Sequence, residues 1–289
     1  MLISKRCLSL IKTTLSIYFC FFWSFSFSQK IVCGPILGAC SDSSAVFWLM
    51  TKKTDSIVVK CLDENVFCSV KKDTNMESLF KKHQAFKLFF THNSKDSFSY
   101  SIKISEKKNI AFTYQIKPKN NDFLFGSCAF IADGVSRAYR FWNTTKIYRS
   151  MTKENVDKMI WMGDNLYLMP FYDLKNQKRI YNRYIGIRSN KDLAGFLTSG
   201  IKHYATWDDH DFGPNNCEGD YENANLTTLA FNNFWVNNPK RDNENVASVV
   251  DNKDVAFFLT DSRTKRSLSS GTYLGDKQLE TLKKNLKKS

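Results

Sequence analysis

The sequence has no internal repeat and no low-complexity block, which excludes solenoid and fibrous architectures and a chain that is disordered throughout. Its basic residues are not gathered into a patch, although 42 Lys and Arg face 28 Asp and Glu. The only run of lysines is Lys283, Lys284, Lys287 and Lys288, which is typical of a solvated helix face. We therefore expect no specific nucleic-acid partner, whereas a positive surface would still attract phosphorylated substrates.

The first residues are typical of an export signal. Lys5, Arg6 and Lys12 precede an apolar stretch from about Leu15 to Phe27, and small residues before Gln29 suit cleavage. This stretch is too short to favour a permanent membrane span. We predict a signal peptide over residues 1–28 and a secreted, periplasmic or cell-surface mature chain with no stable membrane span. An uncleaved anchor is the alternative.

Two patterns of hydrophobic residues divide the rest of the chain. With 289 residues, of which 43% are hydrophobic, it can fill one large domain or two ordinary ones. Residues 29–118 alternate apolar and polar positions in short runs such as 45–49 and 98–104, which predicts a small β-sandwich. Residues 117–122 suit a linker. Residues 119–289 alternate short apolar runs with longer amphipathic stretches, which indicates an α/β domain.

Four strands are predicted in the second region, at 123–126, 159–162, 203–207 and 255–259. Helices are predicted over most of 139–158 and 173–198, near 226–235, and from about Asp276 to the C-terminus. Leu279, Leu282 and Leu286 share one face of the last helix, with lysines opposite.

Six cysteines follow the predicted signal peptide, and an oxidising compartment would permit disulfides. Cys61 and Cys68 bracket what resembles a hairpin tip, which makes a cross-strand bridge one candidate. Cys33 with Cys40 is another. The spacing does not decide the connectivity.

Each predicted strand ends in reactive or charged residues. Cys128 follows the first strand, Asp164 and Tyr167 the second, and the segment Thr206-Trp207-Asp208-Asp209-His210-Asp211-Phe212-Gly213 the third. Asp261 and Arg263 follow the fourth. Because ligands bind at the carboxyl ends of the strands in open α/β sheets, we expect these side chains to converge on one site.

The residue types indicate which chemistry this site would perform. Thiolate with phenolate favours ferric iron, and Asp209 with Asn215 or Asn216 offers hard oxygens that suit calcium. Two cations could clamp a phosphate and lower the pKa of a water molecule, with Asp164 as the bridging carboxylate. His210 would stabilise the transition state or protonate the leaving oxygen, and Asp211 would orient its ring. Arg263 would bind a phosphate oxygen or form a structural pair with an aspartate.

These motifs resemble the alkaline phosphatase D family of PhoD-like metallophosphoesterases. The resemblance rests on Gly126-Ser127-Cys128, Gly163-Asp164-Asn165-Leu166-Tyr167, the Thr206–Gly213 segment, and Leu259-Thr260-Asp261-Ser262-Arg263 followed by Leu274-Gly275-Asp276-Lys277-Gln278-Leu279. Gly34-Pro35-Ile36-Leu37-Gly38 and Ala45-Val46-Phe47-Trp48 are similar to the opening of the family's N-terminal β-sandwich.

The resemblance implies a β-sandwich followed by a calcineurin-like domain that hydrolyses phosphomonoesters or phosphodiesters, with iron and calcium as the metals. It implies Cys128, Asp164 and Tyr167 as iron ligands, Asp209 as a ligand of the second metal, His210 as the catalytic histidine, and a monomer. In the family the chain continues and supplies further ligands, including a later histidine, and nothing after His210 here offers one.

We therefore expect a catalytic domain that is truncated at its C-terminus, with an exposed sheet edge, an uncovered apolar face and poor autonomous stability. A catalytically incomplete protein that binds phosphate or a partner is the alternative to an active enzyme. A basic surface-binding protein that uses the C-terminal lysines is a third hypothesis.

Overall fold

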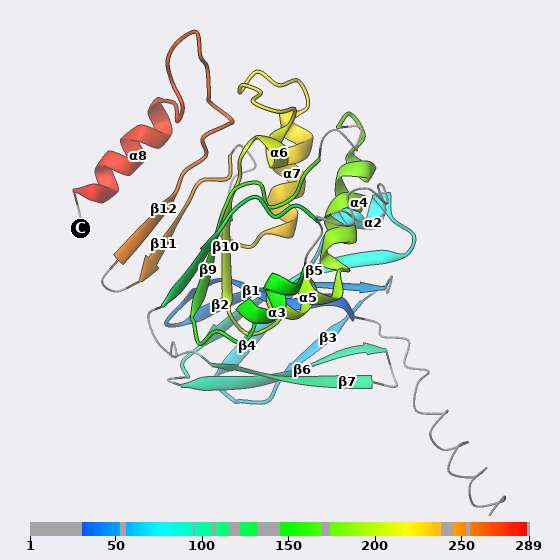
Figure 1. Cartoon of the computed structure of the whole chain (residues 1–289). Coiled ribbons are helices and arrows are strands. Elements are labelled where there is room, and N and C mark those ends of the chain that lie inside the picture. The colour runs from blue at the N-terminus through cyan, green and yellow to red at the C-terminus, as the bar shows by residue number, and fades with distance from the viewer. Residues whose placement is uncertain are drawn as a thin grey trace, which may run out of the picture. The chain divides into compact units, whose positions relative to one another are not determined.

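The computed structural model describes residues 31–52, 56–94, 96–105, 108–115, 122–131, 145–168, 174–237, 245–252 and 255–287. These residues belong to one compact unit, Ile31–Ser289 (Figure 1). The predicted signal peptide and most of the predicted linker lie outside the described residues. Helices and several sheets are mixed along the chain, so the predicted α/β class is confirmed.

The N-terminal strands form two antiparallel sheets. The first sheet, in the order β1-β2-β5-β4, contains β1 (Ile31–Ser41), β2 (Ser44–Lys52), β5 (His83–His92) and β4 (Val66–Lys72). The second, in the order β3-β6-β7, contains β3 (Val58–Cys61), β6 (Ser97–Ser105) and β7 (Lys108–Gln115). A short helix, α2 (Thr74–Leu79), joins β4 to β5 and is capped by the Asp73 side chain, which accepts a hydrogen bond from the Met76 N–H.

The two antiparallel sheets share an aromatic core because their inward positions are large and apolar. The Phe47 ring of β2 lies 5.7 Å from the ring of Tyr100 in β6 and 5.5 Å from the ring of Tyr114 in β7. Phe90 of β5 reaches Tyr100 at 4.7 Å between ring centroids. These contacts across the layers hold the sheets face to face.

A second region is built on a parallel sheet in the order β10-β9-β8. Its strands are β8 (Phe123–Gly126), β9 (Lys158–Met162) and β10 (Lys202–Thr206). The helices of this region are α3 (Lys146–Met151), α4 (Gln177–Arg188), α5 (Lys191–Leu197), α6 (Asp209–Phe212) and α7 (Ala224–Phe234). Because the three strands are parallel and in register, their carboxyl ends meet at one edge of the sheet.

Both faces of the parallel sheet are packed. Met159 and Trp161 of β9 face the core that contains the helices, whereas Ile160 of β9 and Tyr204 of β10 face the opposite side. That opposite side is covered by a hairpin of β11 (Ser248–Asn252) and β12 (Val255–Leu259). Figure 1 shows α4 and α7 on one side of the sheet and this hairpin on the other.

The first antiparallel sheet also packs against the helical side of the second region. The Ala39 N–H of β1 donates to the Val236 carbonyl oxygen at 2.7 Å, and a Cβ on Gly38 would lie 2.5 Å from that same oxygen. Glycine at position 38 therefore permits this close approach of two backbones. Behind it, the buried Arg188 guanidinium lies 4.5 Å from the Trp48 ring and 4.8 Å from the Trp235 ring.

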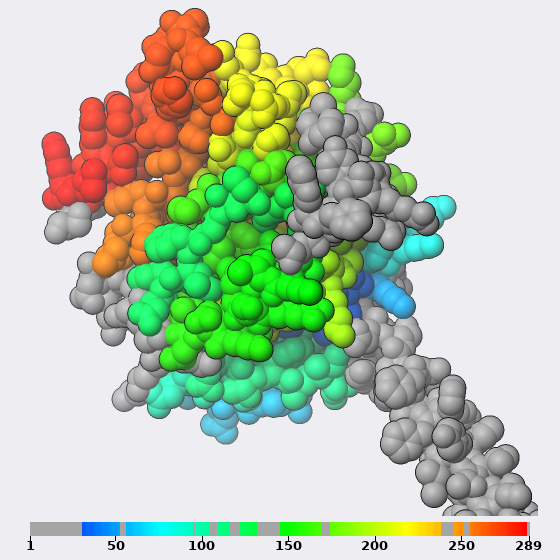
Figure 2. All heavy atoms as spheres, viewed as in Figure 1, coloured from blue at the N-terminus to red at the C-terminus, as the bar shows by residue number. Residues whose placement is uncertain are grey.

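The last helix, α8 (Asp276–Leu286), forms where the leucine spacing predicts it, but none of its residues is buried. Leu279 is 39% exposed and Leu286 57% exposed. Figure 2 shows α8, in red, at the margin of the visible surface. Phe125, Met162 and Val255 are also exposed.

Two helix predictions need correction. Among the described residues of 139–158, only Lys146–Met151 is helical, and Lys158 already belongs to β9. The predicted helix over 173–198 is interrupted after Arg188, where the Asn190 side chain accepts hydrogen bonds from the N–H groups of Asp192 and Leu193 and begins a new helix. An asparagine that caps the backbone ends the preceding helix even where apolar periodicity continues.

Neither disulfide considered from the sequence is present. The six cysteines of the described part are free thiols. Cys61 lies in β3 and Cys68 in β4, which belong to different sheets and not to one hairpin. Cys33 and Cys40 lie seven residues apart on β1, which places them roughly 23 Å apart along an extended strand, far beyond disulfide reach.

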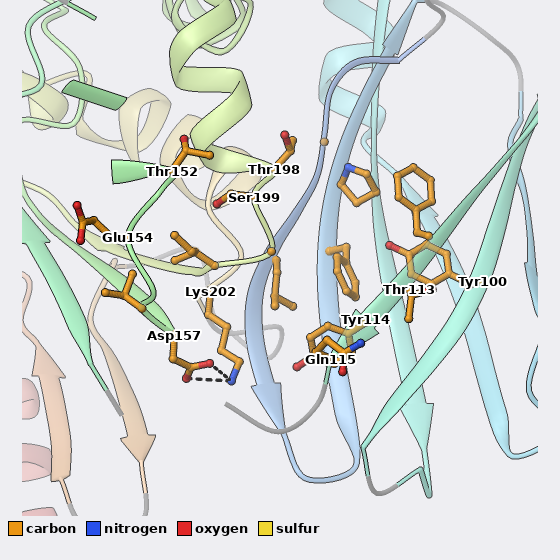
Figure 3. A pocket seen from close by; sticks show the side chains of 18 residues that line it. Tyr100, Thr113, Tyr114, Gln115, Thr152, Glu154, Asp157, Thr198, Ser199 and Lys202 are labelled. Carbon is orange, nitrogen blue, oxygen red and sulfur yellow. Dashed lines mark hydrogen bonds and ion pairs between the residues drawn. The ribbon is translucent and has the colours of Figure 1, made fainter. Parts of the chain in front are cut away.

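A cavity of about 430 Å³ lies at the amino ends of β9 and β10 and is lined partly by β1 and β7. In its lining, the buried Asp157 carboxylate accepts a hydrogen bond from Lys202 Nζ at 3.1 Å (Figure 3). The same carboxylate accepts a hydrogen bond from Lys158 Nζ at 2.7 Å. The sequence-predicted site residues follow the opposite, carboxyl ends of these strands. This cavity is therefore separate from the candidate site.

Candidate metal centre

Three loops at the carboxyl edge of the parallel sheet carry the predicted site residues. They follow β8, β9 and β10 and contain Cys128, Asp164 and Asp209 respectively. Cys128 and Asp164 have positive φ angles of 55° and 52°, a conformation that non-glycine residues seldom adopt. Such strained turns at neighbouring strand ends are common at functional sites, where they direct a side chain to a fixed point.

Backbone contacts hold the first two loops side by side. The Cys128 N–H donates to the Gly163 carbonyl at 3.2 Å, and the Ala129 N–H donates to the Asp164 carbonyl at 2.8 Å. Gly163 has a φ of 102°, and a Cβ there would lie 2.7 Å from the Cβ of Asp208. Glycine is therefore required for the β9 loop to approach the β10 loop.

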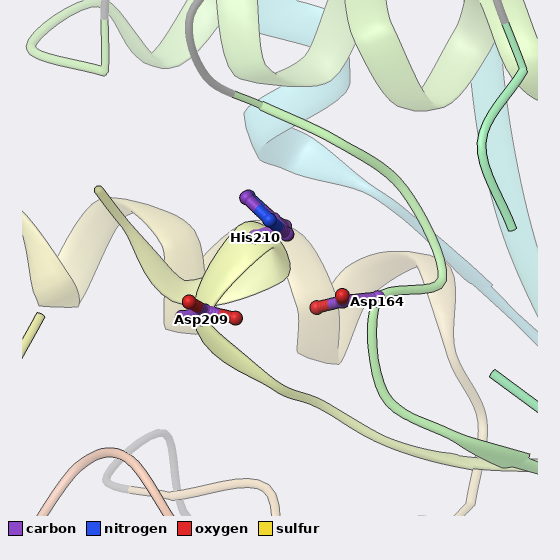
Figure 4. Close-up of side chains that lie close together, drawn as sticks. All are labelled: Asp164, Asp209 and His210. Carbon is purple, nitrogen blue, oxygen red and sulfur yellow. The ribbon is translucent and has the colours of Figure 1, made fainter. Parts of the chain in front are cut away.

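Asp164, Asp209 and His210 form a compact cluster. Each offers one ligand atom, and these atoms lie within 4.8 Å of one another. Asp164 comes from the β9 loop, whereas Asp209 and His210 begin α6, and Figure 4 shows the two carboxylates directed toward each other. Two carboxylates and an imidazole at this separation can hold a cation between them.

Cys128 and Tyr167 extend the cluster through Asp164. Cys128 Sγ donates to Asp164 Oδ2 at 3.6 Å, and Tyr167 Oη donates to the same oxygen at 3.2 Å. The Tyr167 ring lies 4.3 Å from the His210 ring. Cys128 is exposed and Tyr167 and His210 are half-buried, so solvent and small ligands can reach this side of the cluster.

The pKa directions at the cluster follow from burial and from crowded negative charge. Burial raises the pKa of Asp164; His210 opposes this effect, and the nearby Asp209 and Asp208 carboxylates add to it. Burial also raises the pKa of the Tyr167 phenol, as do its contacts with Cys128 and Asp164. A cation in the cluster would reverse both effects by stabilising carboxylate and phenolate.

Asp209 differs from Asp164 in its partners. Burial alone would raise its pKa, but a hydrogen bond from the Asn216 N–H at 2.6 Å and the charge of Arg263 lower it below the ordinary value. Asp209 is therefore a carboxylate even without a cation, as a hard oxygen ligand must be.

Two buried atoms of the cluster are suited to metal binding. Asp164 Oδ1 and His210 Nδ1 have no hydrogen-bond partner among the described residues. A buried polar atom without a partner costs roughly 1–3 kcal/mol, and a bound cation would remove that cost. The donor set of one thiol, one phenol, two carboxylates and one imidazole fits a metal centre.

The chain matches PhoD among solved structures. No protein-family model matches the sequence, and a search of curated proteins finds no match. The solved structure of PhoD superimposes with a TM-score of 0.62 and 17% sequence identity, covering 90% of this chain and 60% of that one. The chain has the fold of PhoD. The resemblance inferred from the motifs is thus confirmed at the level of the fold, and the chain spans 60% of the length of the PhoD chain.

Within this PhoD fold, Asp211 does not lie where a partner of His210 would. Its buried carboxylate accepts hydrogen bonds from the N–H groups of Asn165 at 3.1 Å, Leu166 at 3.2 Å and Asp208 at 3.2 Å. Asp211 therefore joins the β9 loop to the β10 loop and does not contact the free nitrogen of the His210 ring. The expectation that it orients this ring is corrected accordingly.

Arg263 forms the structural pair that was one of its two predicted roles. Its Nε donates to Asp208 Oδ1 at 2.6 Å, its Nη2 is paired with the same oxygen, and Nη2 lies 3.8 Å from Asp209 Oδ1. Asp261 supports this arrangement, because its buried carboxylate accepts the Arg263 N–H at 3.0 Å and the Trp207 indole N–H at 2.8 Å. Asp261 is thus part of the scaffold.

Gly163 and Asn165 are site residues to which the sequence reasoning assigned no role. The Asn165 amide donates to the Thr206 carbonyl at 2.7 Å and thereby links the ends of β9 and β10. The sequence does offer a signal for Gly163: it directly follows a predicted strand and precedes an aspartate, and a glycine at such a turn often has a positive φ. No comparable signal marks Asn165.

Proposed function

We propose that this protein is an exported, metal-dependent phosphoesterase of the PhoD type that hydrolyses phosphomonoesters or phosphodiesters. The observation that carries the proposal is the convergence of Cys128, Asp164, Tyr167, Asp209 and His210 at one edge of a sheet in a chain with the PhoD fold. We further propose a β-sandwich over 29–118, a calcineurin-like catalytic domain from 119, and a monomeric protein with no nucleic-acid partner.

Cys128, Asp164 and Tyr167 would hold ferric iron, because thiolate and phenolate are strong ligands for a highly charged ion. Asp209 would hold calcium together with Asp164, and Asn215 or Asn216 would offer further hard oxygens. When bound, such a pair of ions lowers the pKa of water and polarises a phosphoryl oxygen.

His210 would act on the substrate from the exposed side of the cluster. The His210 side chain is half-buried, so the ring can reach the substrate and donate a hydrogen bond to a phosphoryl oxygen or a proton to the leaving oxygen. Arg263 supports the site by holding Asp208 next to Asp209. Phosphate binding by Arg263, the other predicted role, would require its pairing with Asp208 to open.

The experiment combines metal analysis of the purified protein with hydrolysis of a chromogenic phosphodiester and a chromogenic phosphomonoester. We expect bound iron together with turnover. Asp164→Asn should reduce turnover by more than the roughly 10- to 100-fold that loss of an outer-shell partner costs. Asp42→Asn is the matched control, because Asp42 lies exposed in the turn between β1 and β2. A protein that binds no metal would refute the proposal.

A second candidate is a protein that binds phosphate or a partner without turnover. The observation in its favour is that only His210, of the four histidines, belongs to the cluster; His83 and His92 lie in β5 and His203 in β10. Iron binding and saturable phosphate binding, without hydrolysis of either ester, would favour this candidate. Salt-sensitive binding to an anionic polymer, lost when Lys283, Lys284, Lys287 and Lys288 are neutralised, would instead favour the basic-surface hypothesis.

Export is proposed from the N-terminal sequence. In the described part of the chain, no helix is both long enough and apolar enough to span a bilayer. Mass analysis of the secreted protein tests the proposal. We expect a mature N-terminus near Gln29, and a retained Met1 in an extracytoplasmic protein would indicate the uncleaved anchor instead.

A further inference from the structure

Arg183 is a buried arginine of α4 that contacts the loops after β8 and β9. Only 1% of the residue is exposed. Its Nε donates to the carbonyl oxygen of Tyr167 at 3.1 Å, and its Nη2 donates to the carbonyl oxygen of Ile131 at 2.6 Å. Burial lowers its pKa to about 10, so the guanidinium stays charged at neutral pH. One side chain thus contacts the backbone of both loops.

The chemistry of arginine explains why these two acceptors can be held at once. A guanidinium presents several N–H donors in a rigid planar fork, so two acceptors on different segments are fixed relative to each other. A lysine ammonium is a compact donor on a flexible stem and does not fix this spacing. Burial of a guanidinium charge costs free energy, so its position beneath the two loops indicates a specific role for these hydrogen bonds.

The Arg183 contacts complete a pattern of ties between the two loops. Near the strands, the N–H groups of Cys128 and Ala129 donate across to the β9 loop at 3.2 and 2.8 Å. Farther along the same loops, Arg183 holds Ile131 and Tyr167. Cys128 and Asp164 take part in the first set of ties and Tyr167 in the second, so the backbone of all three ligand residues is held directly.

Tyr167 depends on this arrangement most directly, because Arg183 bonds its own carbonyl group. The Tyr167 ring packs edge-on against Phe130 at 5.1 Å and lies 4.3 Å from His210, while its hydroxyl reaches Asp164 at 3.2 Å. A shift of the backbone at Tyr167 would therefore move the phenol relative to both Cys128 and Asp164.

We propose that Arg183 is a positioning residue of the metal centre, which holds the Cys128 loop and the Asp164–Tyr167 loop at the separation that lets their three ligand groups meet. The expected effect of Arg183 on metal affinity rests on the proposed function. The bracing of the loops can be measured without any metal.

The first measurement is amide hydrogen exchange of metal-free protein, for the wild type, Arg183→Met, Arg183→Lys and the control Arg179→Met. Arg179 lies one turn earlier on α4 and is exposed. Loss of two hydrogen bonds to a charged donor should speed exchange of the Cys128 and Ala129 amides by about tenfold or more. We expect Arg183→Lys to be intermediate and Arg179→Met to match the wild type.

The second measurement is the affinity for ferric iron, followed by the visible absorption of iron bound to phenolate. We expect Arg183→Met to bind iron about 10- to 100-fold more weakly, with an altered absorption band, and Arg179→Met to be unchanged. A general loss of stability would lower the melting temperature without changing the affinity or the spectrum of the folded protein. If Arg183→Met does not fold, Arg183→Lys decides.

Unchanged exchange of the two amides and unchanged iron affinity in a folded Arg183 variant would overturn the inference. If the wild type binds no iron but the amides still depend on Arg183, the proposed function fails and the bracing of the loops is upheld. If the wild type binds iron and Arg183 changes neither property, the proposed function stands and the role of Arg183 is wrong.

Discussion

Replacement of Asp211 by asparagine tests how the β9 and β10 loops are joined. The Asp211 carboxylate is fully buried and accepts three backbone N–H groups, two from the β9 loop and one from Asp208. Leu166 donates to Oδ1, whereas Asn165 and Asp208 donate to Oδ2. Asparagine keeps the shape of the side chain but places an NH₂ group where one of the two oxygens was.

The expected loss of stability follows from counting these bonds. Whichever way the amide is oriented, at least one backbone N–H faces another donor, which costs roughly 1–3 kcal/mol in a buried site. Burial raises the pKa of Asp211, but three N–H donors aimed at its two oxygens favour the carboxylate. With asparagine, the remaining bonds lose the assistance of that charge, which about halves their strength. Together these effects predict that Asp211→Asn lowers the free energy of unfolding by about 3 kcal/mol.

Urea unfolding followed by tryptophan fluorescence measures this loss, because Trp207 and Trp161 lie in the neighbouring core. Asp42→Asn makes the same chemical change in an exposed turn and should shift the unfolding free energy by less than about 0.5 kcal/mol. A loss below about 1 kcal/mol for Asp211→Asn, with an unchanged m-value, would refute the assignment of Asp211 as the joint between the loops.

Three further predictions use the same assay. Burial lowers the pKa of His203 to about 3, and its Nδ1 accepts a hydrogen bond from the Trp161 indole N–H. Below about pH 6 the unfolded chain therefore binds a proton that the folded protein does not, so the free energy of unfolding should fall by about 1.4 kcal/mol per pH unit. His203→Gln should lack this pH dependence. Gly163→Ala should lower the free energy of unfolding by about 2–4 kcal/mol, because both a positive φ and a contact of 2.7 Å oppose the methyl group. Gly200→Ala, where φ is 88° and the space is open, should lower it by only about 1 kcal/mol. Equal losses for the two variants would contradict the close approach of the β9 and β10 loops at Gly163. Asp157→Asn should cost about 3–5 kcal/mol, because it removes the buried carboxylate that pairs with the Lys202 and Lys158 ammonium groups. A change within error would show that these ion pairs are not needed.

The sequence predicts the three parallel strands and the residues that gather after them, because both signals are local. β8, β9 and β10 are short apolar runs, and each is followed at once by the residues that reach the cluster. Parallel strands in neighbouring positions bring the loops after them to one edge of the sheet. Convergence of Cys128, Asp164 and Asp209 therefore requires no knowledge of distant contacts beyond the order of the strands.

The helix boundaries and the thiol pairings depend on non-local or competing interactions. The cap at Asn190 competes with helical periodicity, and the outcome is decided by the Asp192 and Leu193 N–H groups. Cys61 and Cys68 are close in sequence, yet each strand pairs with a different partner, β3 with β6 and β4 with β5. The short separation of the two cysteines along the chain does not reveal that their strands belong to different sheets.

The acidic segment 208–211 shows why similar residues in one motif have different roles. Asp208 caps a helix of one turn with extended backbone, and Asp209, His210 and Asp211 lie in that turn, where successive side chains point about 100° apart. Asp208 pairs with Arg263, Asp209 faces Asp164, and Asp211 turns into the protein, where the backbone of the β9 loop donates to it. Only the residues that point toward the carboxyl edge can share a cation, so the periodicity of one turn, and not the number of acids, determines which of them are candidate ligands.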